Sequence, residues 1–190
     1  GEATPEILEK YSAVMDSIHL IDQLCSLRLK KKRERGAMDL ETSESKIILD
    51  ENRNVKEIKP RGTGRSENII EEMMLLANES AATFALEKHL PFCFRVHEPP
   101  SPDKLQNLAE LLAAIGQSKR DIQPGVSPTR LAQVLEGVRG TKYQMIVNSQ
   151  MLRTMSKAKY SEKNIGHFGL VLQNYAHFTS PIRRYPDLFI

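Results

Sequence analysis

The chain has 190 residues, of which 40% are hydrophobic and 27% charged, and its formal net charge is +3. This balance is ordinary for a globular protein with a hydrophobic core and argues against a disordered chain. No apolar run approaches the roughly 18 residues of a membrane-spanning helix, and the first residues lack a secretion signal, so we expect a cytoplasmic protein with no membrane segment. Cys25 and Cys93 lack the spacing of a disulfide or zinc pair and are expected to be buried, reduced thiols.

The first half of the chain predicts two long helices separated by a hairpin. Apolar residues recur at helical spacing from Ile7 to Cys25 and predict one helix with a single buried face. Ser66 is expected to cap the second long helix, which Pro91 stops. In chain order, the expected elements are a helix that begins after Pro5 and ends near Gly36, strands at 46–49 and 54–58, a basic loop at 60–65, and the helix that starts at Ser66.

The second half predicts one short strand followed by shorter helices. Phe92, Phe94 and Val96 alternate with less apolar neighbours, as strand residues do. A serine followed by proline, at 101–102 and again at 127–128, is typical of a helix start. The expected elements are a strand at 92–96, a helix at 101–116, a polar linker at 117–127, a short helix from 127 and a helix at 143–158. We therefore expect an α+β fold in which several amphipathic helices pack on short, mostly antiparallel strands.

The last part of the chain, residues 167–188, gathers histidines, aromatic residues and two adjacent arginines. Ser180 followed by Pro181 predicts the N-cap and first turn of another helix. Arg183 and Arg184 would then lie beside the free N–H groups at the positive end of that helix. This arrangement predicts a site for anions such as phosphate.

The histidines and aromatic residues of the same stretch each allow two interpretations. His167 and His177 lack a third ligand at helical or strand spacing, so we expect them to hydrogen-bond phosphate or backbone rather than zinc. Tyr185 either stacks on a base or packs in the core.

Residues 175–188, Tyr-Ala-His-Phe-Thr-Ser-Pro-Ile-Arg-Arg-Tyr-Pro-Asp-Leu, resemble the signature near the end of the catalytic (RNB) domain of the ribonuclease II and ribonuclease R family, above all its bacterial ribonuclease R branch. The family consists of processive exoribonucleases that degrade RNA from its 3′ end. The resemblance implies that the intact protein hydrolyses RNA to nucleoside 5′-monophosphates with Mg2+. It also implies that residues 1–190 are a partial RNB catalytic domain that lacks its N-terminal aspartate cluster and its C-terminal end. We therefore expect no metal ligands in this chain and no hydrolysis by the chain alone.

The same resemblance assigns roles to individual residues. Arg183 takes the place of the family's catalytic arginine, which contacts phosphate near the scissile bond. The run 69–79 resembles a helix whose first glutamate of a pair, here Glu71, faces the RNA 3′ end. The other residues expected to contact RNA are His177, Ser180, Arg184 and Tyr185. For Arg184 the alternative is an ion pair with Asp187 across one helical turn.

Other features leave the function open. The basic residues from Arg28 to Arg35 predict either a patch that attracts a polyanion or a solvated helix end. Leu40 stands where the family has an aromatic residue that clamps the terminal bases, and leucine offers no π face for stacking. A different class of function is a non-catalytic RNA-binding or interaction module. A purely helical adaptor has only the amphipathic helices in its favour.

Overall fold

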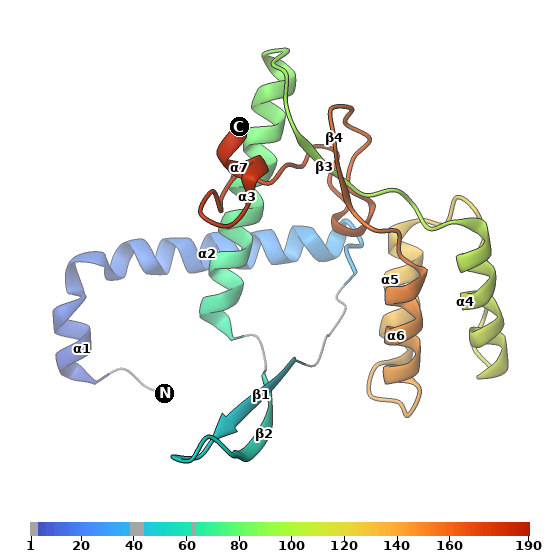
Figure 1. Ribbon diagram of the computed structural model, residues 1–190, viewed down its shortest axis with the longest axis horizontal. Helices are drawn as coiled ribbons and strands as arrows, with labels where there is room; N and C mark the ends of the chain where they lie inside the picture. Colours follow the sequence, from blue (N-terminus) through green and yellow to red (C-terminus); the bar gives the residue numbers. More distant parts are fainter. Residues whose placement is uncertain (1–3, 39–43, 62–63) are drawn as a thin grey trace.

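The computed structural model describes residues 4–38, 44–61 and 64–190. The helix α2 runs across the molecule and α3 crosses it, whereas α4, α5 and α6 form a group on one side (Figure 1). The helices are α1 (Pro5–Lys10), α2 (Ser12–Glu34), α3 (Arg65–Glu87), α4 (Pro102–Ala114), α5 (Pro128–Val138), α6 (Gln144–Thr154) and α7 (Tyr185–Phe189). The strands form two antiparallel pairs, β1 (Glu44–Leu49) with β2 (Val55–Arg61) and β3 (Phe94–Val96) with β4 (Lys159–Ser161). The predicted α+β class is confirmed.

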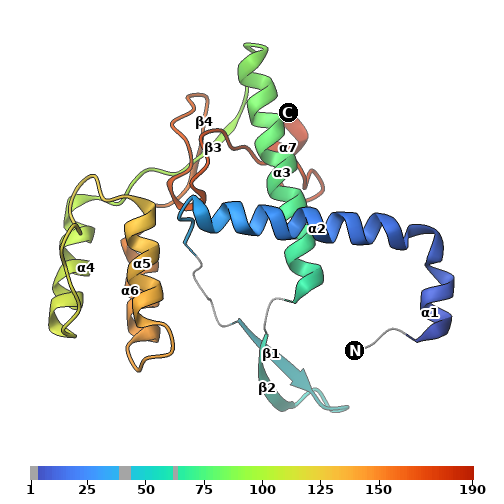
Figure 2. The ribbon, with the colours of Figure 1, turned by 180° about the vertical axis from the view of Figure 1, so that it is seen from behind.

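The N-terminal helical segment differs from its prediction in two ways. It is two helices, because the chain leaves helical geometry at Tyr11 (φ −106°, ψ 11°). Its apolar stripe is exposed rather than buried, and Cys25 alone is buried among the residues of α2. Side chains at the predicted buried positions, such as Val14 and Ile18, are 46% and 44% exposed. The reason is that α3 crosses α2 instead of lying along it (Figures 1 and 2), so the two helices share only a short contact.

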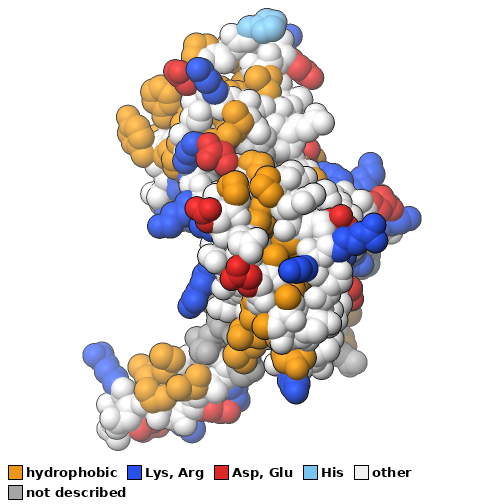
Figure 3. Space-filling view, turned by 90° about the vertical axis from the view of Figure 1, so that its right-hand side faces the viewer, with side chains coloured by type: hydrophobic (Ala, Val, Ile, Leu, Met, Phe, Trp, Pro, Cys, Tyr) orange, Lys and Arg blue, Asp and Glu red, His pale blue; other side chains and the backbone are white. Residues whose placement is uncertain are grey.

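The predicted hairpin is present, with Ile47 opposite Ile58 in the β1–β2 register. Most of its apolar side chains, namely Ile47, Leu49, Val55 and Ile58, are exposed, and a hydrophobic cluster is visible at the bottom of Figure 3. The predicted cap of the next helix is wrong. Gly64 is the N-cap of α3, and the Ser66 hydroxyl, already inside the first turn, donates to Glu67 Oε2 at 2.9 Å. The helix ends at Glu87, before Pro91, as predicted.

Three helices, α4, α5 and α6, enclose the larger hydrophobic core. Both serine-proline starts are confirmed, and the Ser127 hydroxyl accepts a hydrogen bond from the Arg130 backbone N–H at 3.2 Å. The fully or almost fully buried members of this core include Leu105, Leu108, Leu112, Leu131, Val138, Val147 and Met151. Helix α6 ends at Thr154 rather than near residue 158, because Met155 is extended and leads into β4.

A second, smaller cluster joins the end of the chain to α3. Phe94 and Val96 of β3 pack with Ala82 of α3 and with Ala176. Phe94 also forms a bridge with Ala176, so residues 175–176 continue the small sheet next to α3. Both ribbon views place α7 beside α3 as a result (Figures 1 and 2). This packing brings the arginine-containing end of the chain to the first half of α3.

Candidate active site on helix α3

A cavity of about 540 Å3 lies where α3 meets the end of the chain. Its wall is mostly apolar, with Glu71 at one position and Arg184 at another, so the fold brings together two residues predicted to contact RNA. The residues around it are Ser66, Glu67, Ile70, Glu71, Met74, Leu75, Asn78, Tyr175 and Arg184. A cavity of this size with an apolar wall and a few charged groups is typical of a ligand site.

Asn78 fixes the end of the chain on α3. It is buried, its Oδ1 accepts hydrogen bonds from the backbone N–H groups of Phe178 (2.9 Å) and Thr179 (3.2 Å), and its Nδ2 donates to Tyr175 Oη (3.1 Å). Burial raises the pKa of the Tyr175 hydroxyl above its ordinary value, so this group stays protonated. Asn78 was not among the residues predicted from the sequence. The signal that could have found it is a polar residue among the apolar residues of a helix.

The predicted helix start at Ser180 is wrong. Residues 181–183 form a turn, and α7 begins only at Tyr185 and has five residues. The Ser180 N–H donates to Asp187 Oδ2 at 2.9 Å, and the Ser180 carbonyl accepts from the backbone N–H groups of Arg183 and Arg184. Residues 180–187, named here the arginine loop, are therefore closed by Asp187. The predicted phosphate site made of free helix N–H groups is absent from this loop.

The two arginines lie in different surroundings. Arg184 Nη2 donates to Asp187 Oδ2 at 2.8 Å, and the arginine side chain is 16% exposed. Of the two roles left open for Arg184, the structure shows the ion pair, while the same residue also lines the cavity. Arg183 is exposed, and its side chain has no hydrogen bond or ion pair to the described part of the chain. Arg183 therefore offers an unpaired, exposed guanidinium and is the neighbour in sequence of Arg184, which lines the cavity.

His177 is partly buried, whereas Tyr185 is exposed. His177 Nδ1 lies 2.7 Å from Tyr160 Oη, and burial, together with the charges of Arg184 and Arg95, lowers the pKa of this histidine to about 4. It is neutral at pH 7, so any contact with phosphate would be a hydrogen bond without a charge. Tyr185 is 76% exposed and stacks on Phe189, which excludes the core role that the sequence allowed.

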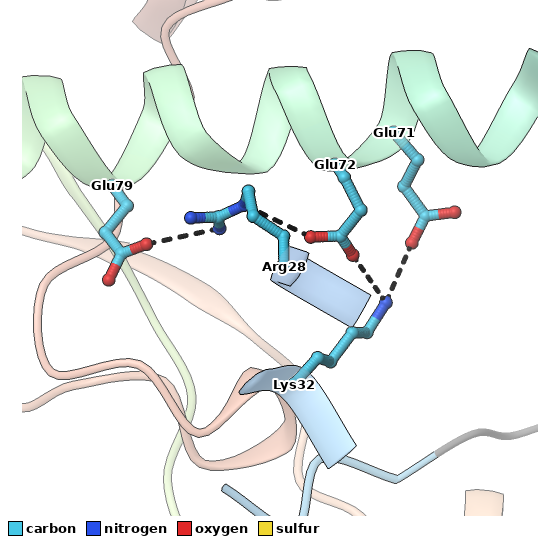
Figure 4. A network of polar contacts seen from close by, with 5 residues as sticks. All are labelled: Arg28, Lys32, Glu71, Glu72 and Glu79. Atoms are coloured by element: carbon cyan, nitrogen blue, oxygen red, sulfur yellow. Dashed lines mark hydrogen bonds and ion pairs between the residues drawn. The ribbon is translucent and has the colours of Figure 1, made fainter. Parts of the chain in front are cut away.

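The basic run at residues 28–35 does not form a single patch. Arg28 and Lys32 point from α2 toward three glutamates of α3 (Figure 4). Lys32 Nζ lies 3.2 Å from a carboxylate oxygen of Glu71 and 3.2 Å from one of Glu72. Burial opposes the charged form of Lys32, but the two carboxylates outweigh it and raise its pKa above the ordinary value. For these residues both sequence interpretations are wrong, because their charge holds two helices together.

The two adjacent glutamates of α3 differ in burial. Glu72 is buried, 1% exposed, and its other oxygen lies 3.3 Å from Arg28 Nε. Glu71 is about half exposed and lines the cavity. Arg28 also contacts Glu79 at 3.4 Å. Glu72 is thus placed as a structural residue and Glu71 as one that a ligand can reach.

The family model of the RNB domain matches residues 3–190. The chain belongs to the RNB domain family. This RNB chain is 40% identical to ribonuclease R 1 of Lactococcus lactis over 96% of its length and 41% identical to ribonuclease R of Thermotoga maritima over 98%. It spans only 22% and 26% of those two relatives. Among solved structures, Mycoplasma genitalium RNase R in complex with ribose methylated single-stranded RNA superposes with a TM-score of 0.85 at 32% identity, over 93% of this chain and 28% of that one.

Within the described residues, the donors of this RNB chain do not form the magnesium site that the family resemblance implies for the intact protein. Among residues 4–38, 44–61 and 64–190, no three His, Cys, Asp or Glu side chains gather as a metal site would require. Leu40, where the family has a base-stacking aromatic, lies outside the described residues. Within the same described ranges, no helix of the RNB chain is sufficiently long and apolar to cross a membrane.

Proposed function

We propose that this RNB chain forms the substrate-holding side of an exoribonuclease active site, in a protein that degrades RNA from the 3′ end to nucleoside 5′-monophosphates. The observation that carries the proposal is the exposed, unpaired Arg183, which directly precedes Arg184 in a loop packed on the cavity that Glu71 and Arg184 line. Family membership and the ribonuclease R relatives support the same reaction.

The residues at the cavity have the chemistry that RNA requires. The guanidinium of Arg183 is planar and permanently charged, so it can donate two hydrogen bonds to phosphate oxygens as charge develops on them. Glu71 uses Oε1 for Lys32, which leaves its second oxygen to accept from a ribose hydroxyl. The apolar side chains of Ile70, Met74 and Leu75 give a surface for a base. Ser180, Tyr185 and His177 complete the proposed contacts around the arginine loop.

The cofactor and the partner belong to the same proposal. Mg2+ would be held by residues other than those described, and it would activate the attacking water and stabilise the leaving oxygen. RNA with a free 3′ end is the proposed substrate, since the structure of Mycoplasma genitalium RNase R contains single-stranded RNA. We propose a cytoplasmic location for the whole protein.

The role of Arg183 can be tested in a full-length protein that contains this segment. Arg183→Ala should reduce single-turnover cleavage by about 100-fold or more, while RNA affinity, which is spread over many backbone contacts, changes far less. Arg183→Lys should restore little activity because an ammonium lacks the bidentate geometry. Cleavage of 5′-labelled RNA and fluorescence anisotropy measure the two quantities. A wild-type cleavage rate in Arg183→Ala, or an effect confined to affinity, would contradict the assignment.

The alternative is a non-catalytic RNA-binding module, which needs the same basic loop but no metal. The two proposals differ in the full-length protein supplied with Mg2+. Release of mononucleotides that depends on Arg183 supports the enzyme. RNA binding that depends on Arg183, with no release of mononucleotides, supports the module.

A further inference from the structure

The two adjacent arginines of the arginine loop differ because Asp187 can reach only one of them. Asp187 follows Arg184 by three positions and Arg183 by four, and in a continuous helix a carboxylate could pair with either. Here the backbone at Arg184 is extended (φ −132°, ψ 116°), so residues 183–187 do not form one helix. The carboxylate pairs with Arg184, and Arg183 stays exposed.

One oxygen of Asp187 holds both sides of the loop. Oδ2 accepts a hydrogen bond from the Ser180 N–H at 2.9 Å and from Arg184 Nη2 at 2.8 Å. The Ser180 carbonyl in turn accepts from the Arg183 N–H at 3.2 Å. The backbone of Arg183 is thus connected to Asp187 through Ser180. The Asp187 side chain is 0% exposed, so its charge depends on these partners rather than on water.

We propose that Asp187 is a positioning residue that occupies Arg184 and fixes the turn at Ser180, so that Arg183 alone is presented to the RNA phosphate. This inference rests on the proposed function, and it assigns the two arginines different tasks. Arg184 acts through its contact with Asp187, and Arg183 acts on the substrate. Without the carboxylate charge, Arg184 is released to compete for the phosphate and the turn that carries Arg183 loses its fixed position.

The test uses Asp187→Asn in a full-length protein that contains this segment. The amide keeps an oxygen that can accept from the Ser180 N–H, but it removes the charge that holds Arg184. We expect single-turnover cleavage of 5′-labelled single-stranded RNA to fall on the order of ten- to a hundredfold, because small displacements of a catalytic group have effects of this size. The affinity for the same RNA should stay within about threefold of wild type, since most of it comes from other backbone contacts.

A double-mutant cycle separates positioning from a general loss of structure. If Asp187 acts by placing Arg183, Asp187→Asn should have no further effect on the cleavage rate in an Arg183→Ala background. A merely structural role would lower the rate by the same factor in both backgrounds, which would overturn the proposal. Glu136→Gln is the matched control, because Glu136 forms an exposed i,i+3 pair with Arg139 in α5, away from the cavity. Its cleavage rate should equal that of wild type.

Arg184→Lys is a second test, which remains available if Asp187→Asn does not fold. It changes the partner of Asp187 and keeps the buried charge pair. The arginine makes a single 2.8 Å contact with Asp187, which an ammonium can replace. Because lysine can keep the charge pair with Asp187, we expect Arg184→Lys to lower the cleavage rate far less than Arg183→Ala does. A loss as large as that of Arg183→Ala would overturn the proposal, because Arg184 would then contact the phosphate itself. If Arg183→Ala retains full activity, the proposed function fails instead, whatever Asp187→Asn does.

Discussion

The adjacent glutamates of α3 should respond in opposite ways to replacement by alanine. Glu72 is 1% exposed and touches both Arg28 and Lys32. Removing one partner of a buried ion pair costs about 3–5 kcal/mol, because the opposite charge remains buried. Arg28 keeps Glu79 and Lys32 keeps Glu71 in the variant. We therefore expect Glu72→Ala to lower the free energy of unfolding by somewhat less, about 2–3 kcal/mol.

Glu71→Ala is the matched control for stability and the test for recognition. Its carboxylate is 53% exposed, and an exposed ion pair contributes about 0–1 kcal/mol. If Glu71 accepts from ribose hydroxyls, its loss should reduce the preference for RNA over DNA of the same sequence. Glu72→Ala should keep that preference at temperatures where the variant is folded.

The assay combines urea unfolding, followed by circular dichroism, with binding of single-stranded RNA and DNA. Three results would refute the reasoning. They are equal losses of stability in the two variants, a loss below about 1 kcal/mol for Glu72→Ala, and an unchanged RNA preference in Glu71→Ala. The first two would contradict the burial argument, and the third would contradict the assigned contact.

Two further predictions concern pH and salt. Burial lowers the pKa of His167 and His177 to about 4 from an ordinary 6.5, so the unfolded chain binds more protons between these values. The free energy of unfolding should therefore fall as pH drops from 6.5 toward 4, and His167→Gln should weaken that dependence; identical urea midpoints against pH in both proteins would contradict this. The 190-residue chain alone should bind single-stranded RNA weakly and lose affinity as salt rises, without releasing mononucleotides in Mg2+; salt-independent binding or robust release would contradict it.

The sequence predicted the secondary structure best where it depends on residues that are adjacent in the sequence. The starts of α4 and α5 follow from Ser101-Pro102 and Ser127-Pro128, because caps and first-turn prolines act locally. The strand β4 was missed because Lys159–Ser161 is a strand only by pairing with β3, far away in the sequence. The apolar stripe of α2 was predicted to be buried in a core, but no part of the described chain covers it.

In the candidate site, too, the sequence predicted some features and missed others. The motif at residues 175–188 singled out the two arginines, and the resemblance of residues 69–79 to a family helix singled out Glu71, which lines the cavity. Which arginine is paired could not be read from spacing, because Asp187 is within reach of both until the backbone at Arg184 is known. Ser180 resembled a helix cap because Pro181 follows it, but residues 181–183 form only a turn and the extended backbone at Arg184 delays the helix to Tyr185.

The hydrogen bonds of Asn78 also have a consequence for how the protein folds. They join α3 to backbone 100 and 101 residues later in the chain, and the whole α4–α6 group lies between the two ends of that loop. Closing a long loop costs entropy before the contact returns any stability, whereas the helices inside the loop can form from nearby residues. We therefore expect the cavity to be completed late in folding, after the helical group has formed. A chain can reach nearly its full helix content and still lack the surface that would hold RNA.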